Sequence, residues 1–144
     1  MLDRFADFMA GITECHRYVL RIKNLEMTEL GLKGYHMMCL FCLGRSEEGL
    51  TAAQLAAMCF EDKAAISRSI ADLENGGYVA PADPNVKYRS TLVLTEKGEK
   101  LVEFVNGLVE QWVYMGGDGL TDEERTIFYR ALGKIAANLR EKVG

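Results

Sequence analysis

Hydrophobic positions recur at steps of three and four residues in three long stretches of the chain, which is the spacing of amphipathic helices. The stretches run over Leu2–Leu25, Leu101–Val113 and Ile127–Leu139. Thr121 and Glu124 form a capping box that predicts where the third helix begins. The pattern therefore predicts one long helix at the N-terminal end of the sequence and two at the C-terminal end.

Between these stretches the pattern changes to two short helices followed by a ribbon. Thr51 with Gln54 is a second capping box, and Asp62 is a good N-cap for the next helix. Two glycines, at 76 and 77, end that helix, and hydrophobic alternation over 90–94 indicates a strand. This strand would pair with one at Tyr78 and Val79. The order predicts a winged helix-turn-helix, in which one helix enters the major groove of DNA.

The second short helix has two different faces. Ile66, Ile70 and Leu73 fall on one side and would pack inward. Small residues and Arg68 occupy the other side, where a backbone can approach base edges and Arg68 can reach a guanine or a phosphate. Cations on the ribbon would reach a flanking minor groove or phosphate. The candidate DNA contacts are Lys63, Ala64, Ala65, Ser67, Arg68, Lys87 and Arg89. The alternative is a solvated helix face beside an ordinary surface hairpin.

The segment AAISRSIADLENGGYV, followed by YRSTLVLTEKG, resembles the MarR family of bacterial transcriptional regulators. The resemblance implies a homodimer that binds a palindromic operator, usually as a repressor released by a small ligand or by oxidation. Many members carry an Asp-Arg or Arg-Arg pair at the tip of the wing, whereas residues 85–89 here read Asn-Val-Lys-Tyr-Arg. Arg89 would take that role from a shifted position.

The predicted fold is mainly α with a small β-wing, in a single MarR-like domain over residues 1–144. The winged helix-turn-helix would occupy 28–98, and the helices of 1–27 and 99–144 would form a dimer. Three helices this apolar exceed what one small winged core can cover, so a second copy of the chain would bury the remainder. The alternative is a self-contained helical bundle.

Composition agrees with a folded protein but not with a strongly basic one. Hydrophobic residues make up 49% of the 144 residues, too many for a disordered chain. No apolar run approaches the ~20 residues that span a bilayer, and no secretion signal is recognisable. Four cysteines without a secretory context favour reduced thiols in the cytoplasm. The net charge of −4 predicts modest, salt-dependent DNA affinity that relies on two half-sites.

A helix expected over about Leu32–Gly44 supplies aromatic, methionine and cysteine side chains. These could line a pocket for a flat apolar effector, although core packing is the commoner use of such a stripe. The candidate pocket residues are Cys15, Tyr35, His36 and Cys39. Metal sensing and thiol sensing are alternatives, but no second Cys pair follows Cys39-x-x-Cys42, and Cys15 and Cys59 lie on apolar stripes that suit burial.

The sequence offers no motif for catalysis. It contains two histidines, and we find neither a phosphate-binding glycine loop nor a nucleophile elbow. We therefore expect no enzyme, no cofactor and no resident metal. The expected function is a cytoplasmic regulator with operator DNA, a second copy of itself and a small-molecule effector as partners, and no membrane. A winged-helix module used only for protein–protein contact is the alternative from another class.

Overall fold

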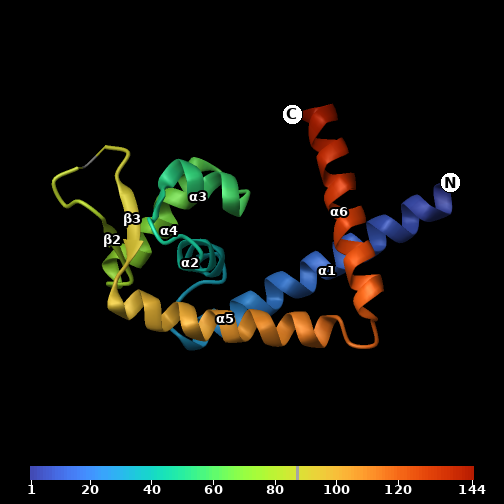
Figure 1. Cartoon of the computed structure of the whole chain (residues 1–144), viewed down its shortest axis with the longest axis horizontal. Helices are drawn as coiled ribbons and strands as arrows, with labels where there is room; N and C mark the ends of the chain where they lie inside the picture. The colour runs from blue at the N-terminus through green and yellow to red at the C-terminus, as the bar shows by residue number, and fades with distance from the viewer. Residues whose placement is uncertain (87) are drawn as a thin grey trace. The chain divides into compact units, whose positions relative to one another are not determined.

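The computed structural model describes residues 1–86 and 88–144. The chain divides into two compact units, Met1–Asn106 and Gly107–Gly144; the helix α5 begins in the first and ends in the second. The elements are α1 (Leu2–Glu29), α2 (His36–Gly44), β1 (Leu50–Thr51), α3 (Ala52–Cys59), α4 (Lys63–Asn75), β2 (Val79–Pro81), β3 (Thr91–Leu94), α5 (Glu96–Gly116) and α6 (Asp122–Val143) (Figure 1). The predicted class, mainly helical with a small β-wing, is confirmed.

The helix starts in the middle of the chain follow from local side-chain caps. The hydroxyl of Thr51 accepts a hydrogen bond from the Gln54 backbone N–H at 3.2 Å, and the Gln54 side chain accepts one from the Thr51 N–H at 2.9 Å. The Asp62 carboxylate accepts from the Ala65 N–H at 2.7 Å. These bonds satisfy backbone donors that have no partner inside the helix. Both predicted helix starts are confirmed.

A three-stranded antiparallel sheet with the order β1-β3-β2 forms the base of the wing. Val79 pairs with Leu94 in the predicted ribbon, and Leu50 pairs with Leu92 at the other edge of β3. The ribbon is confirmed, but β1 has only two residues and was not predicted. So short a strand carries no readable alternation, and it exists because β3 supplies hydrogen-bond partners from far along the chain.

The helix α2 begins at His36, four residues later than the sequence indicated. Gly31 adopts a φ of +71°, which ends the preceding helix, and the chain then turns through 31–35. Gly34 lies against Asn24 of α1 so closely that a Cβ atom would overlap the Asn24 side chain. An apolar period does not reveal this close approach or the turn, so the sequence pattern alone placed the helix start too early.

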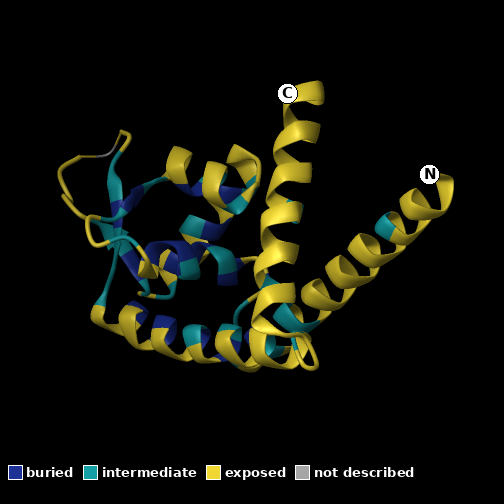
Figure 2. Ribbon diagram, turned by 45° about the vertical axis from the view of Figure 1, so that its right-hand side comes forward, coloured by how far each residue is buried: buried dark blue, intermediate teal, exposed yellow. Residues whose placement is uncertain are grey.

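The core of the first unit lies where α2, α3, α4, the sheet and the first half of α5 meet (Figure 2). Almost every turn of α2 is buried, whereas Met27 is the single buried residue of α1 among the described residues. The side chains that are essentially inaccessible to solvent are Met27, Met37, Cys39, Leu40, Leu55, Ile66, Leu73 and Val105. The inward face predicted for α4 is thus confirmed at Ile66 and Leu73.

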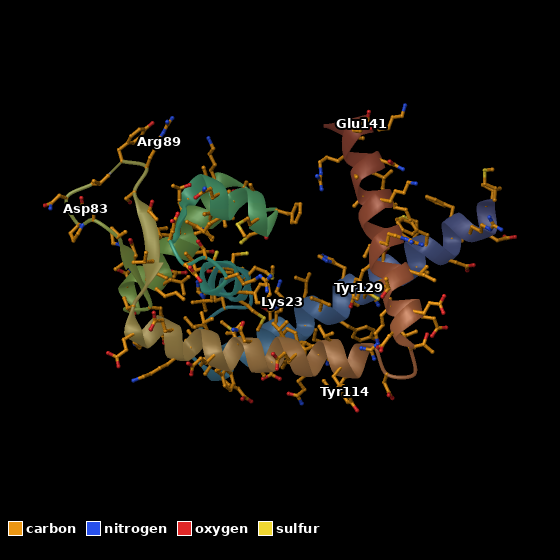
Figure 3. All side chains as sticks on the ribbon, in the orientation of Figure 1. Lys23, Asp83, Arg89, Tyr114, Tyr129 and Glu141 are labelled. Carbon is orange, nitrogen blue, oxygen red and sulfur yellow. The ribbon has the colours of Figure 1, made fainter. Side chains whose placement is uncertain are left out.

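In the second unit, α6 begins with the predicted capping box. The Thr121 hydroxyl accepts from the Glu124 N–H at 3.2 Å, and the Glu124 carboxylate accepts from the Thr121 N–H at 2.8 Å. Gly119, at a φ of +78°, belongs to the turn that separates α5 from α6. The helix α6 buries no residue within the single chain, and Tyr114 and Tyr129 are both exposed (Figure 3).

Within the described residues, no helix has the length and apolar character needed to span a membrane.

Candidate DNA-binding surface

The outward face of α4 presents small residues together with two cations. Lys63, Ala64, Ser67 and Arg68 are all exposed, while Ile66 and Ser69 on the opposite side are buried. Because alanine and serine side chains are short, the helix backbone could lie close to a base edge, with Arg68 extending beyond it. Ala65, the remaining candidate on this helix, is half-buried at the edge of that face.

A polar clamp fixes the C-terminal half of α4 to the start of α2. His36 Nε2 lies 3.0 Å from Oδ2 of Asp72, and the Tyr35 hydroxyl donates to the same oxygen at 3.2 Å. The backbone N–H of Lys33 donates to His36 Nδ1 at 3.0 Å, so Nδ1 is the unprotonated nitrogen. The tautomer follows: Nε2 carries the hydrogen and donates to Asp72. No sequence pattern predicts this contact, because His36 and Asp72 are 36 positions apart.

The clamp is built around a neutral imidazole. Burial lowers the pKa of His36 below its ordinary value, and this outweighs the opposing effect of Asp72. Hydrogen bonding from His36 lowers the pKa of Asp72, with a further contribution from Tyr35. Protonated His36 would turn an Nδ1–H toward the Lys33 N–H, which places two donors against each other. The clamp is therefore complete when His36 is neutral and Asp72 is ionised.

The wing carries the second group of predicted contacts. Arg89 has a φ of +52°, in the left-handed region, and its guanidinium lies 5.2 Å from the ring centre of Tyr88. The Asp83 carboxylate accepts a hydrogen bond from the Asn85 N–H at 2.9 Å, which shapes the turn. Figure 3 shows the Asp83 and Arg89 side chains projecting away from the helices. Lys87, also a predicted contact, lies outside the described residues.

Hydrogen bonds engage several of the acidic groups near this surface. Asp62 caps α4, Asp72 belongs to the clamp, and Asp83 holds the wing turn. Their charges remain, but each carboxylate is directed toward a donor of the protein itself. This arrangement leaves Lys63, Arg68 and Arg89 as exposed cations on α4 and the wing, even though the whole chain is acidic.

A cavity of about 400 Å³ opens beside α4 in the first unit. Its lining comes from α1, α2 and α4 and from the end of α3. The lining residues are Leu20, Lys23, Asn24, Gly34, Tyr35, Met38, Cys59, Glu61, Ala65, Ile66, Arg68 and Ser69. Arg68 thus borders both this cavity and the outward face of α4.

The cavity and the predicted effector pocket share one residue. Tyr35 lines the cavity, whereas His36 and Cys39 are buried in the protein and Cys15 is exposed on α1. The burial of Cys15 expected from its apolar stripe is therefore not observed in the single chain. Sequence reasoning missed Lys23 and Arg68 as lining residues, because no periodic pattern shows which helix will lie opposite α4.

Within 1–86 and 88–144, no group of three or more His, Cys, Asp or Glu side chains is arranged to hold a metal ion.

Comparison with known proteins connects this geometry to one family. Residues 30–87 match the model of the MarR family. A MarR family transcriptional regulator from Listeria monocytogenes, solved in complex with a 26mer DNA, is 25% identical to this chain and superposes with a TM-score of 0.84. The alignment covers 93% of this chain and 89% of that one. A SlyA-like transcription regulator from the same organism is 25% identical with a TM-score of 0.81, and the alignment covers 92% of this chain and 89% of that one.

The same fold recurs in further structures. A MarR protein from Peptoclostridium difficile is 23% identical with a TM-score of 0.83, and the alignment covers 94% of this chain and 89% of that one. No match to this sequence was found among curated proteins. The resemblance predicted from 64–79 and 88–98 is confirmed. The chain is thus similar to the MarR family over residues 30–87, and as a whole it has the winged-helix fold of the MarR-family transcriptional regulators.

Proposed function

We propose that this protein is a homodimeric transcriptional regulator that binds operator DNA in a sequence-specific manner. The observation that carries the proposal is the face of α4, where Lys63, Ala64, Ser67 and Arg68 are exposed while Ile66 is buried behind them. A helix with short side chains and an arginine on its free face suits major-groove reading. The 26mer DNA bound to the Listeria monocytogenes protein supports the same use of the fold.

The exposed apolar side chains of the terminal helices support a homodimer. On α6, Phe128, Leu132, Ile135 and Leu139 follow each other at helical spacing, and none is buried within the single chain. The helix α1 likewise exposes large apolar residues, among them Leu2, Phe5, Met9, Ile12, Val19 and Leu25. A soluble monomer rarely leaves this much apolar surface in water, and a second copy would cover it.

The cavity beside α4 supports regulation by a small-molecule effector. It joins the apolar side chains of Leu20 and Met38 to the cations of Lys23 and Arg68. A ligand that draws Arg68 toward the cavity would remove that side chain from DNA. We therefore propose a repressor that the effector releases, acting in the cytoplasm without catalytic chemistry of its own.

The test is selection of bound fragments from random duplex DNA, followed by titration of Arg68→Ala on the selected site. Loss of one base-directed contact should weaken binding by roughly 1–3 kcal/mol. Arg45→Ala is the matched control, because Arg45 is an exposed arginine at the end of α2 and belongs neither to α4 nor to the wing. If no duplex is enriched, the operator proposal fails and the interpretation as a protein–protein module gains. If both variants weaken binding equally, the proposed reading of DNA by Arg68 fails.

A further inference from the structure

Asp72 lies on α4 where two sets of partners compete for its carboxylate. It follows Arg68 by four positions, so the two side chains lie one turn apart on the same side of the helix. Arg68 and Tyr35 also border the same cavity, which places Arg68 on the side of α4 from which Tyr35 reaches Asp72. A carboxylate and a guanidinium at this spacing attract each other and form an ion pair when both are free.

In the structure α2 engages Asp72 instead. Its Oδ2 accepts hydrogen bonds from His36 Nε2 at 3.0 Å and from the Tyr35 hydroxyl at 3.2 Å. Because both donors bind the same oxygen, they hold the carboxylate on the side of α2. Arg68 and Asp72, both among the described residues, form no ion pair within 4.0 Å. The Arg68 guanidinium therefore stays available on the exposed side of α4.

The two donors differ in how firmly they are held. His36 is 3% exposed, and the Lys33 N–H donates to its Nδ1 at 3.0 Å, which directs the Nε2–H at Asp72. The Tyr35 ring meets the imidazole edge-on, with 4.4 Å between the ring centres, and is 43% exposed at the wall of the cavity. Asp72 is thus held by one donor fixed in the core and by a second donor at the surface.

We propose that His36 and Tyr35 are positioning residues for Arg68: by holding Asp72 against α2, they keep its carboxylate from pairing with the arginine. The inference rests on the proposed function, in which Arg68 reads DNA. Once Asp72 is released, its carboxylate pairs with Arg68 along α4 and draws the guanidinium away from the groove. An exposed pair at this spacing is worth a factor of about 1.4–2.3, and a dimer places two copies of Arg68 on the operator. Release of Asp72 should therefore weaken operator binding by about two- to fivefold.

The experiment is a double-mutant cycle on the full chain, read as affinity for the duplex selected from random DNA. Tyr35→Phe and His36→Leu each remove one donor to Asp72, and together they release it. Binding should weaken in each variant and most in the combination. Adding Asp72→Asn should restore most of this loss, because an amide carries no charge to attract the guanidinium. The gain should exceed the one that Asp72→Asn gives in the parent chain.

Stability separates positioning from a merely structural role. Asp72→Asn should not recover the free energy of unfolding that is lost with the two donors, because their hydrogen bonds remain absent. Affinity should therefore recover where stability does not. Glu74→Gln is the matched control: it removes one negative charge from an exposed position of α4, but six positions after Arg68 and hence on another side of the helix. Its effect on affinity should be the same with and without the two donors.

A second measurement needs no DNA. The pKa of Asp72 is followed by NMR in the parent chain and in the chain that lacks both donors. Arg68→Ala should leave this pKa unchanged in the parent chain and raise it in the chain without the donors, because there it removes the positive partner of the carboxylate. If urea denaturation shows that His36→Leu does not fold, Tyr35→Phe alone serves both measurements, since its hydroxyl lies at the surface.

Two results would overturn the proposal. The first is an equal gain in affinity from Asp72→Asn with and without the donors, which is the effect of a distant charge alone. The second is an Asp72 pKa that does not respond to Arg68→Ala once the donors are removed. If no duplex is enriched, the proposed function fails, and the NMR titration still decides whether the released Asp72 pairs with Arg68.

Discussion

The imidazole of His36 donates a hydrogen bond from Nε2 to Oδ2 of Asp72 across 3.0 Å, and this joins the start of α2 to α4. His36 is 3% exposed, whereas the Asp72 side chain is 45% exposed. The bond therefore connects a core residue to the helix that is proposed to enter DNA. Whatever changes the protonation of this pair acts on the placement of α4.

The clamp should make the protein less stable in mild acid. The pKa of His36 is lowered in the folded protein, so the unfolded chain binds more protons just below the ordinary histidine pKa of about 6.5. The stabilisation that the neutral His36 provides is complete above the ordinary histidine pKa. It is lost as the pH falls below that value toward the lower pKa of His36 in the folded protein. Asp72, whose pKa is lowered from 3.8, contributes in the same direction at still lower pH.

The measurement is the free energy of unfolding by urea at pH 8 and pH 5.5. His36→Gln should lose much of the difference between the two pH values, because glutamine does not titrate. His16→Gln is the control, since His16 is the other histidine and is exposed on α1. An unchanged pH difference in His36→Gln would show that the clamp does not control the acid response.

Removing the N-terminal cap of α4 should destabilise the protein. Asp62→Ala leaves the Ala65 N–H without its 2.7 Å partner, and loss of such a cap costs about 0.5–2 kcal/mol. Asp62→Asn keeps an oxygen acceptor and should stay close to the parent in urea denaturation. If Asn and Ala destabilise equally, charge rather than the hydrogen bond is responsible.

DNA affinity should fall steeply with salt, because binding releases counterions from the phosphates. Lys63→Ala removes one of the proposed phosphate contacts, at the start of α4, and should reduce the slope of log K against log salt by about one. Ser67→Ala, on the same exposed face but uncharged, should keep the parent slope. Fluorescence anisotropy on the selected duplex measures both, and a salt-independent affinity would contradict the proposed phosphate contacts.

The dimer should depend on the apolar side chains of α6. Phe128→Glu places a charge on an exposed apolar side chain, 52% exposed in the single chain, and should shift the protein toward monomers because a buried unpaired charge is costly. Phe60→Glu is the matched control, since Phe60 is 83% exposed in the turn between α3 and α4. Analytical ultracentrifugation gives the mass in solution. A monomeric parent chain would refute the dimer.

The chain's own residues determined the elements whose causes are local. Thr51, Asp62 and Thr121 cap helices through partners three residues away, so their sequence pattern was sufficient to place three helix starts. The inward positions Ile66 and Leu73 followed from helical periodicity. The same periodicity placed Ser67 and Arg68 on the free face of α4, and these are the residues on which the proposed DNA surface depends.

The tertiary structure decided the contacts between distant positions. Leu50 pairs with Leu92, and His36 contacts Asp72, although no local pattern links the members of either pair. Such contacts depend on how helices pack around a shared core, and their spacing along the chain carries no signal of its own. For that reason the sequence alone could propose a DNA-reading helix, but only the folded chain showed what clamps it and which residues line the cavity beside it.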